Sequence, residues 1–370
     1  MINKQELAQS ELREPDEPCN VILEVTHPAH AHFFANVFRM LITNGHRVLV
    51  TSRKKDCAID LLEDLNIPHT PLSEKKGKSI MGTFSELLLR DYRLIRTARN
   101  FRADVIAAVG GTSAAHASRA LGIPGLVFYD TEDARLQNLL TYPFAAKVYV
   151  PDCYSGSVPA AKTIRYSGYH ELAYLHPNHF RASRSEAVRN GLDPDKDNFF
   201  IRVVEWAASH DVGYKGWSEE LLQSAVSLLA SRGKVIISSE AVLPVTLEKY
   251  RYQGNVSGIH HLMAYCRLSL GESATMASEC VVLGTPSIYC SDAPRSYISE
   301  QSEKHRLAVI VSPTNQTQIF DAVQRFMELP STEIQRRHQA LLDTTIDVSD
   351  FVYREIVSSA AINSSLRAGI

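Results

Sequence analysis

Short apolar runs alternate with longer amphipathic stretches along roughly the first 150 residues of the chain. Five of the runs are rich in β-branched or aromatic residues: NVILEV, RVLVTS, DVIAAV, GLVFYD and KVYVP. Between them lie helix-length segments such as 31–43 and 55–65. Because this alternation is typical of βαβ units, it predicts a parallel sheet covered by helices.

A long helix is predicted over 80–101. Its apolar positions recur at helical spacing. Four arginines lie between them: Arg90, Arg93, Arg96 and Arg99. This helix should therefore expose a basic stripe.

The alternation stops between about 151 and 195, where Pro, Gly, Ser and Tyr are frequent. A second series of strand-like and helix-like segments starts at NFFIRVV. Its helices are expected near 217–231, 259–265 (a helix or a turn), 274–283, 315–328 and 349–360, the last crossing back onto the first domain. We predict five parts: a disordered extension over 1–18, an N-terminal Rossmann-like domain over 19–170, a linker over 171–195, a C-terminal Rossmann-like domain over 196–345, and a final helix and tail over 346–370.

Length and composition agree with this division. With 370 residues, the chain exceeds the roughly 250–300 residues at which a single core stops growing. A net charge of -2 gives no reason to expect nucleic acid as a partner. Six scattered cysteines without a C-x-x-C pair indicate reduced thiols and a cytoplasmic protein. Neither a signal-like N-terminus nor an apolar run of about 18 residues occurs, so we expect any membrane association to be peripheral, at the inner face.

The segment RLSLGESATMASECVVLGTP (267–286) predicts a strand, a turn of small residues and a helix. The turn consists of four residues, Glu272, Ser273, Ala274 and Thr275. Thr275 is also a candidate N-cap. Unpaired N–H groups and the positive end of a helix dipole suit a diphosphate at this place. Glu279, about one turn further on, could accept two ribose hydroxyl hydrogens; the alternative is a capped helix with an exposed glutamate.

Polar residues follow other strands of this half: Arg202, then Ser238, Ser239 and Glu240. His260 and His261 lie just before the strand RLSLGE. Because the carboxyl ends of parallel strands share one edge of a sheet, we expect these residues to converge on one crevice. Arg202 or His261 would counter phosphate charge there. The alternatives are a surface ion pair for Arg202 and structural roles for the histidines.

Three histidines lie between the first strand and the first helix, in THPAHAHFF: His27, His30 and His32. Imidazole suits zinc, but the spacing is not the i, i+4 of helical zinc pairs and no carboxylate adjoins them, so we expect no metal. We predict that His30 is a general base that deprotonates an acceptor hydroxyl, and that His32 braces the loop. The alternative is that these histidines cap the helix or pack beneath the phenylalanines.

Acidic residues follow the strand GLVFYD on the same edge: Asp130, Glu132 and Asp133. They could supply the base, orient the histidine, or cap the next helix. The turn over 110–113, GGTS, ends another strand and could contact an acceptor phosphate or sugar. An NDP-sugar already carries a good leaving group, so one base is enough for transfer.

Two Rossmann-like halves, with G-E-S-A-T-M-A-S-E-x-x-x-L-G-T-P in the second, resemble the GT-B architecture. The pattern is similar to that of the peptidoglycan UDP-N-acetylglucosamine transferase and of the non-hydrolysing UDP-N-acetylglucosamine 2-epimerases. From about 19 to 330 the chain resembles more closely a family of largely uncharacterised prokaryotic GT-B-like proteins. The blocks that carry this resemblance are 26–34, 201–213 (IRVVEWAASHDVG), 237–240, 259–265 and 271–286. The resemblance implies a ribose role for Glu279, a phosphate role for the 272–275 turn, and donor binding by the C-terminal half.

We therefore predict an α/β protein of GT-B-like fold, with two doubly wound parallel-sheet domains and a ligand cleft between them. The predicted function is a glycosyltransferase that moves a sugar from an NDP-sugar, UDP-linked, to an acceptor hydroxyl in surface glycan or glycolipid synthesis. The alternatives are an NDP-sugar 2-epimerase or hydrolase, and a non-catalytic nucleotide-sugar-binding protein. No Asp-x-Asp motif lies in a suitable turn, so we expect Arg202 and the helix dipole, rather than a metal or other cofactor, to neutralise the phosphates.

Overall fold

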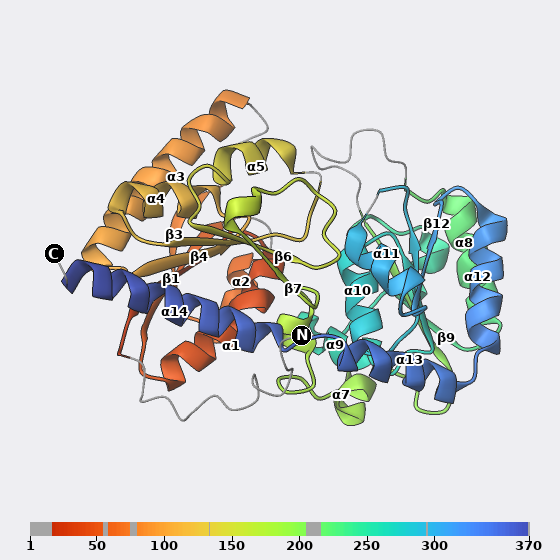
Figure 1. The fold of residues 1–370 in the computed structure, drawn as a ribbon. Helices are drawn as coiled ribbons and strands as arrows, with labels where there is room; N and C mark the ends of the chain where they lie inside the picture. Colours follow the sequence, from red (N-terminus) through yellow and green to blue (C-terminus); the bar gives the residue numbers. More distant parts are fainter. Residues whose placement is uncertain are drawn as a thin grey trace.

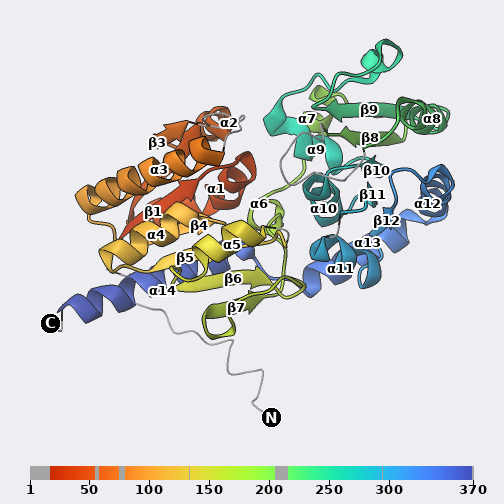
Figure 2. The same ribbon diagram turned by 90° about the horizontal axis from the view of Figure 1, so that it is seen from above.

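The computed structural model describes residues 17–54, 58–74, 80–132, 134–204, 216–293 and 295–368. Apart from its last two residues, the extension predicted over 1–18 lies outside these ranges. Two α/β domains lie side by side, each with a parallel sheet between layers of helices (Figures 1 and 2). The predicted fold class is confirmed.

The N-terminal domain has a seven-stranded parallel sheet in the order β3-β2-β1-β4-β5-β6-β7. Its strands are β1 (Asn20–Val25), β2 (Arg47–Lys54), β3 (His69–Glu74), β4 (Val105–Val109), β5 (Gly125–Phe128), β6 (Lys147–Pro151) and β7 (Thr163–Tyr166). Its helices are α1 (Pro28–Thr43), α2 (Ala58–Asp64), α3 (Ile80–Phe101), α4 (Thr112–Leu121), α5 (Arg135–Thr141) and the 3₁₀ turn η1 (Ala160–Lys162). The strand order reverses between β1 and β4, which is where such sheets open a crevice at their carboxyl edge.

The C-terminal domain has a five-stranded parallel sheet in the order β12-β11-β10-β8-β9. Its strands are β8 (Asn198–Val203), β9 (Lys234–Ser239), β10 (Leu268–Gly271), β11 (Ser287–Cys290) and β12 (Ala308–Val311). Its helices are α8 (Glu219–Ala230), α9 (Ile259–Met263), α10 (Ala274–Val282), α11 (Ser296–Glu303), α12 (Gln316–Glu328) and α13 (Ser331–Asp343), with 3₁₀ turns η2 (Val245–Tyr250) and η3 (Val256–Gly258).

The segment between the two sheets carries two short helices, α6 (Leu172–Leu175) and α7 (Arg184–Arg189). One apolar cluster runs from the N-terminal domain through this segment into α10 and α11, and it includes Leu172, Val281 and Ile298. At the carboxyl ends of β5 and β11, the backbone N–H of Ser296 donates to Oε1 of Glu132 over 3.3 Å. The carboxyl edges of the two sheets therefore face each other across the domain boundary.

The last helix, α14 (Val348–Ala368), crosses back and packs on the N-terminal domain beside α1 (Figure 1). Its apolar face enters that domain's core through Val348, Val352, Ile356 and Ala360. The helix predicted over 349–360 is thus confirmed, but its predicted end is wrong. It continues past 360, and Asn363 Nδ2 donates to the Asp104 carbonyl over 3.3 Å. The apolar period ends at 360, so the polar last turns gave no signal.

Candidate functional site

The helix α10 begins at the carboxyl end of β10, where the chain turns at Glu272 and Ser273. Ser273 is the N-cap, since its hydroxyl accepts from the Met276 N–H over 3.3 Å. The cap predicted at Thr275 is wrong, because Thr275 already lies inside the helix. A side chain at Gly271 would clash with the Arg202 backbone, so only glycine lets β10 and β8 approach this closely here. The first N–H groups of α10 thus open at the sheet edge beside Arg202.

Arg202 joins this turn, as predicted. With Gly271 and Ser273 it lines a cavity of about 10 Å³, which is about enough for one water molecule. Its NH1 donates to Ser238 Oγ over 2.8 Å, and its NH2 forms an ion pair with the exposed Glu240. Arg202 therefore lies beside the start of α10, and its guanidinium is held at the end of β9 by a partner that an incoming phosphate could displace.

The side chains of Ser239 and Glu272 form hydrogen bonds with the backbone of the C-terminal domain. Ser239 Oγ donates to the Ala241 carbonyl over 2.8 Å. The buried Glu272 carboxylate accepts from Trp217 N–H over 2.7 Å and from Val204 N–H over 3.2 Å. It therefore holds both ends of the segment 205–215, whose residues lie outside the described ranges.

Glu279 lies further along α10, at the boundary between the domains, with only 6% of its surface exposed. Its Oε1 accepts from the Tyr174 hydroxyl over 2.7 Å and from His260 Nε2 over 3.0 Å. Burial alone would raise the pKa of Glu279, but His260 and Tyr174 outweigh it and hold the pKa below its ordinary value. Glu279 is therefore an ionised carboxylate rather than the exposed one of the alternative hypothesis.

His32 completes the group around Glu279 from the other domain. Its ring stacks on Tyr174, with centroids 5.0 Å apart, and meets His260 edge-on at 5.3 Å. Burial, and then the neighbouring His260, lower the pKa of His32 to about 4, so its ring is neutral at pH 7. We call Glu279, Tyr174, His260 and His32 the Glu279 cluster. It joins α1, α6, α9 and α10.

His261 does not join this cluster. Its ring stacks on Phe180 with centroids 4.8 Å apart, and its Nδ1 accepts from the Ser183 N–H over 3.1 Å. Adjacent residues on a helix point about 100° apart. His261 therefore faces the connecting segment, while His260 faces Glu279.

The three histidines of THPAHAHFF have different positions and contacts. His27 is the N-cap of α1, accepting from the Ala29 N–H over 3.3 Å. His30 was expected just before the helix but lies in its first turn, because Pro28 starts α1. The Thr26 N–H donates to His30 Nδ1 over 3.4 Å, which places the proton of a neutral ring on Nε2. Among the described residues, no group of three or more His, Cys, Asp or Glu is arranged to hold a metal ion.

Asp130, just after β5, pairs with a histidine that the sequence did not single out. Its Oδ2 lies 3.3 Å from His170 Nδ1, and Thr131 Oγ1 donates to its Oδ1 over 3.0 Å. Burial would raise the pKa of Asp130, but His170 outweighs it and keeps the carboxylate charged. His170 Nε2 is buried and finds no hydrogen-bond partner in the part of the chain that the structure describes.

Glu132 lies beside this pair and reaches the other domain, where its Oε1 caps α11 at Ser296. Its Oε2 is buried and is also without a partner among the described residues. Asp133 lies outside those residues. The loop after β5 therefore brings the charged Asp130 carboxylate and an unsatisfied Glu132 oxygen close to His170, which follows β7 and whose Nε2 is also unsatisfied among the described residues.

Glu171 is a second residue that the sequence did not single out. It is 3% exposed, between Asp130 and Glu279. Burial, followed by repulsion from Asp130, raises the pKa of Glu171 from 4.5 to about 8, while Ser278 bonds to the charged form. Glu171 is therefore largely protonated at pH 7.

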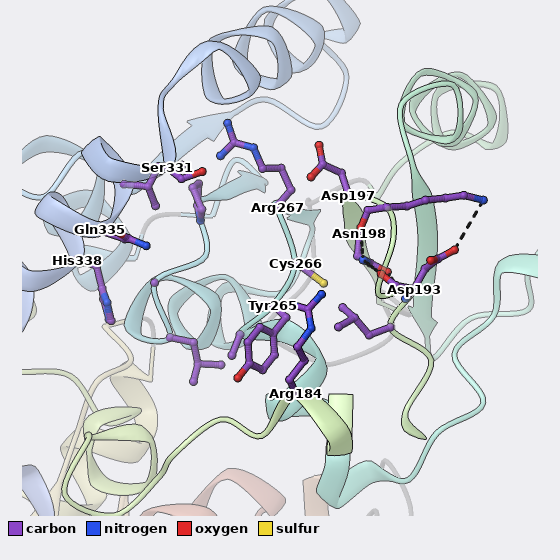
Figure 3. Close-up of a pocket in the computed structure, with 17 residues that line it drawn as sticks. Arg184, Asp193, Asp197, Asn198, Tyr265, Cys266, Arg267, Ser331, Gln335 and His338 are labelled. Atoms are coloured by element: carbon purple, nitrogen blue, oxygen red, sulfur yellow. Dashed lines mark hydrogen bonds and ion pairs between the residues drawn. The ribbon is translucent and has the colours of Figure 1, made fainter. Parts of the chain in front are cut away.

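A cavity of about 590 Å³ lies at the opposite, amino edge of the C-terminal sheet (Figure 3). Its lysine and arginine side chains already have partners: Lys196 pairs with Asp193 at 3.7 Å, Arg184 donates to the Pro194 carbonyl, and Arg267 donates to three carbonyls at the end of α12. Ligands of parallel sheets bind at the carboxyl edge, so this cavity is not the candidate site.

Solved structures of similar fold cover nearly the whole chain. A putative UDP-N-acetylglucosamine 2-epimerase from Listeria monocytogenes has a TM-score of 0.67 and 11% identity, covering 94% of this chain and 97% of that one. The UDP-GlcNAc 2-epimerase from Neisseria meningitidis, bound to UDP-GlcNAc, has a TM-score of 0.63 and 14% identity, covering 92% and 99%. The glycosyltransferase SnogD from Streptomyces nogalater has a TM-score of 0.60 and 12% identity, covering 92% and 99%.

Identities this low show the fold alone, and the fold is GT-B. A search of curated proteins gave no match. A family model does match, over residues 19–353, which include both sheets and the start of α14. The chain thus belongs to the family described as "Protein of unknown function (DUF354)".

Proposed function

We propose that the protein is a metal-independent glycosyltransferase that moves a sugar from an NDP-sugar, UDP-linked, to an acceptor hydroxyl of a surface glycan or glycolipid. The observation that carries the proposal is the start of α10, where capped backbone N–H groups and Arg202 lie together at the carboxyl edge facing the other domain. This arrangement suits a diphosphate, because the helix dipole and a guanidinium both favour its charge.

The Glu279 cluster supports binding of the nucleoside. Among the described residues, Oε1 of Glu279 takes both protein hydrogen bonds, which leaves Oε2 for ribose hydroxyls. Since the carboxylate is ionised and half of its hydrogen-bonding capacity is used by fixed partners, it is oriented before the ligand arrives. Glu279 would thus bind the ribose while α10 and Arg202 bind the diphosphate.

The pair Asp130–His170 supports proton transfer on the acceptor side. With Nδ1–H directed at the Asp130 carboxylate, His170 Nε2 is left as a proton acceptor. The acceptor hydroxyl would give its proton to Nε2 as its oxygen bonds to the anomeric carbon, and the bond from that carbon to the diphosphate would break to release NDP. The hydrogen bond from Thr26 makes Nε2 of His30 a donor, so we assign the base to His170 rather than His30.

The first test is ligand-induced stabilisation. UDP at 100 times its Kd is expected to add about 2.7 kcal/mol of stability, measured as a thermal shift in the presence of EDTA. Glu279→Gln should weaken UDP binding at least tenfold, since hydrogen bonds to charged groups contribute about 1.5–3 kcal/mol each. Glu303→Gln, exposed on α11, is the matched control. Unchanged UDP affinity in Glu279→Gln would refute the ribose assignment.

Turnover then separates the three candidate functions. A transferase consumes the sugar nucleotide only with a second substrate, an epimerase or hydrolase consumes it alone, and a binding protein consumes none. Release of UDP that depends on an added acceptor and survives EDTA is the expected result. Consumption without acceptor, or activity that requires Mn²⁺, would contradict the proposal.

A further inference from the structure

The helices α3, α4 and α5 cover one face of the N-terminal sheet (Figures 1 and 2). Large apolar side chains are exposed on and beside them. Seven of these side chains are between 37% and 72% exposed: Phe84, Leu88, Tyr92, Leu136, Leu139, Leu140 and Phe144. We call these seven residues the α3–α5 surface. Isolated exposed apolar residues are ordinary, but a group on neighbouring helices indicates an interaction site.

The two halves of this surface are held together by His116 on α4. Its Nδ1 lies 2.7 Å from Asp91 Oδ2 on α3, and its Nε2 lies 2.9 Å from the Leu140 carbonyl on α5. The His116 ring also meets the Phe144 ring edge-on, with centroids 4.8 Å apart. His116 therefore holds α3 and α5 on either side of α4. On α3 itself, Phe84, Leu88 and Tyr92 follow one another at four-residue steps and form one exposed stripe.

The charged residues on these three helices are mostly basic. They carry six arginines, Arg90, Arg93, Arg96, Arg99, Arg119 and Arg135, and two acidic residues, Glu86 and Asp91. Both acids are already paired, Glu86 with Arg53 and Ser73, and Asp91 with His116. The rest of the protein carries an excess of negative charge that offsets these arginines, since the whole chain has a net charge of -2. Arg90 points inward, where it pairs with Glu24 and Glu86. The other five arginines are exposed, so these three helices have an excess of positive charge at their surface.

We infer that this surface docks on an anionic lipid bilayer. Apolar side chains flanked by arginine suit the interface of such a membrane, where each basic residue contributes about 1 kcal/mol and apolar side chains insert among the headgroups. None of the helices that the structure describes is long and apolar enough to cross a membrane, so the contact is peripheral.

The position of α5 relates docking to the proposed site. The side chain of Gln137 on α5 lies against Gly110, where a Cβ would overlap it, and Gly110 ends β4 at the crevice beside β1. A protein docked through this surface would present that crevice to molecules carried by the bilayer. Docking itself does not rest on the proposed transfer reaction, and its test involves no turnover.

The test is sedimentation of the full-length protein with vesicles. Binding is expected to vesicles of 30% phosphatidylglycerol in phosphatidylcholine, to be absent with phosphatidylcholine alone, and to weaken as NaCl rises from about 0.1 to 0.5 M, because salt screens charge. The double variants Leu136→Ser/Leu139→Ser and Arg96→Gln/Arg99→Gln should each lower the partition coefficient at least tenfold. Unchanged thermal stability and UDP response in the same preparations show that the fold is retained.

The control is Val242→Ser/Val245→Ser, which removes two valines that are 94% and 91% exposed on the C-terminal domain. It should bind vesicles as the wild type does. No binding of the wild type to anionic vesicles would overturn the inference, as would equal binding by the Leu136→Ser/Leu139→Ser variant. A dimer in analytical ultracentrifugation that this variant abolishes would also overturn it, because a second copy of the chain would then cover the surface.

Discussion

Replacing His170 by glutamine is expected to lower kcat of the proposed transfer by about 10²–10⁴-fold, the usual contribution of a general base, with UDP affinity unchanged. The reason is the unsatisfied Nε2 of His170, whose Nδ1 lies against the Asp130 carboxylate. Buried polar atoms are rarely without a partner, so this one is expected to receive a hydrogen bond from the acceptor. The measurement is the rate of UDP release at saturating donor.

Two comparisons separate catalysis from structure. His305→Gln is the matched control, because His305 is equally buried and its Nε2 also lacks a partner among the described residues, but it lies just before β12, at the amino edge of the other sheet. Asp130→Asn should lower kcat as well, by favouring the wrong tautomer of His170. If the two residues act as a unit, the double variant His170→Gln/Asp130→Asn should lose no more kcat than either single variant. Additive losses would mean that Asp130 does not act through His170. Full activity in His170→Gln together with a loss in His30→Gln would return the base to His30.

Glu171→Gln is expected to stabilise the protein at pH 8 and to leave its stability unchanged at pH 4.5. Burial and the neighbouring Asp130 raise the pKa of Glu171 from 4.5 to about 8, so the folded protein keeps a proton that the unfolded chain releases. The stability that depends on this proton is complete below about pH 4.5, falls by about 1.4 kcal/mol per pH unit, and is lost above about pH 8. Glutamine never ionises and so avoids this loss.

The measurement is Tm of variant minus wild type between pH 4.5 and 8.5. At pH 8 the difference should reach several degrees, because each kcal/mol shifts Tm by about 2–4 °C in a domain of this size. Glu63→Gln on α2, where the side chain is exposed, should show no such trend. A flat difference for Glu171→Gln would mean that burial and the neighbouring Asp130 do not raise the pKa of Glu171.

The two sheets were predictable because β-branched runs and helical spacing are local properties of the sequence. Two of the missed elements are short and carry little such signal: β7 has four residues, TIRY, and α6 has four, LAYL. The helix α13, with 13 residues, was missed despite its length. The helix of the proposed donor site was predicted, but its cap was not, because Ser273 and Thr275 are both residues that cap helices and the backbone conformation decides between them.

The candidate site was predicted only in part, because only some of its residues follow from local patterns in the sequence. Arg202 and the 272–275 turn follow neighbouring strands, so topology alone places them together. The partners of Glu279 and Asp130 could not be found this way. Tyr174 lies 105 residues from Glu279, and His170 occurs in an aperiodic segment, YSGYHEL, that predicts no strand or helix. Contacts of this range depend on how the domains pack, which no local pattern encodes.

The return of α14 to the first domain sets an order of events during synthesis. Val348, Val352, Ile356 and Ala360 line the core of the N-terminal domain, but the ribosome adds them only after every strand of the C-terminal domain. Until then the nascent N-terminal domain has an open apolar wall beside α1, which is the kind of surface that chaperones bind. The first domain to be translated is therefore the last to be completed.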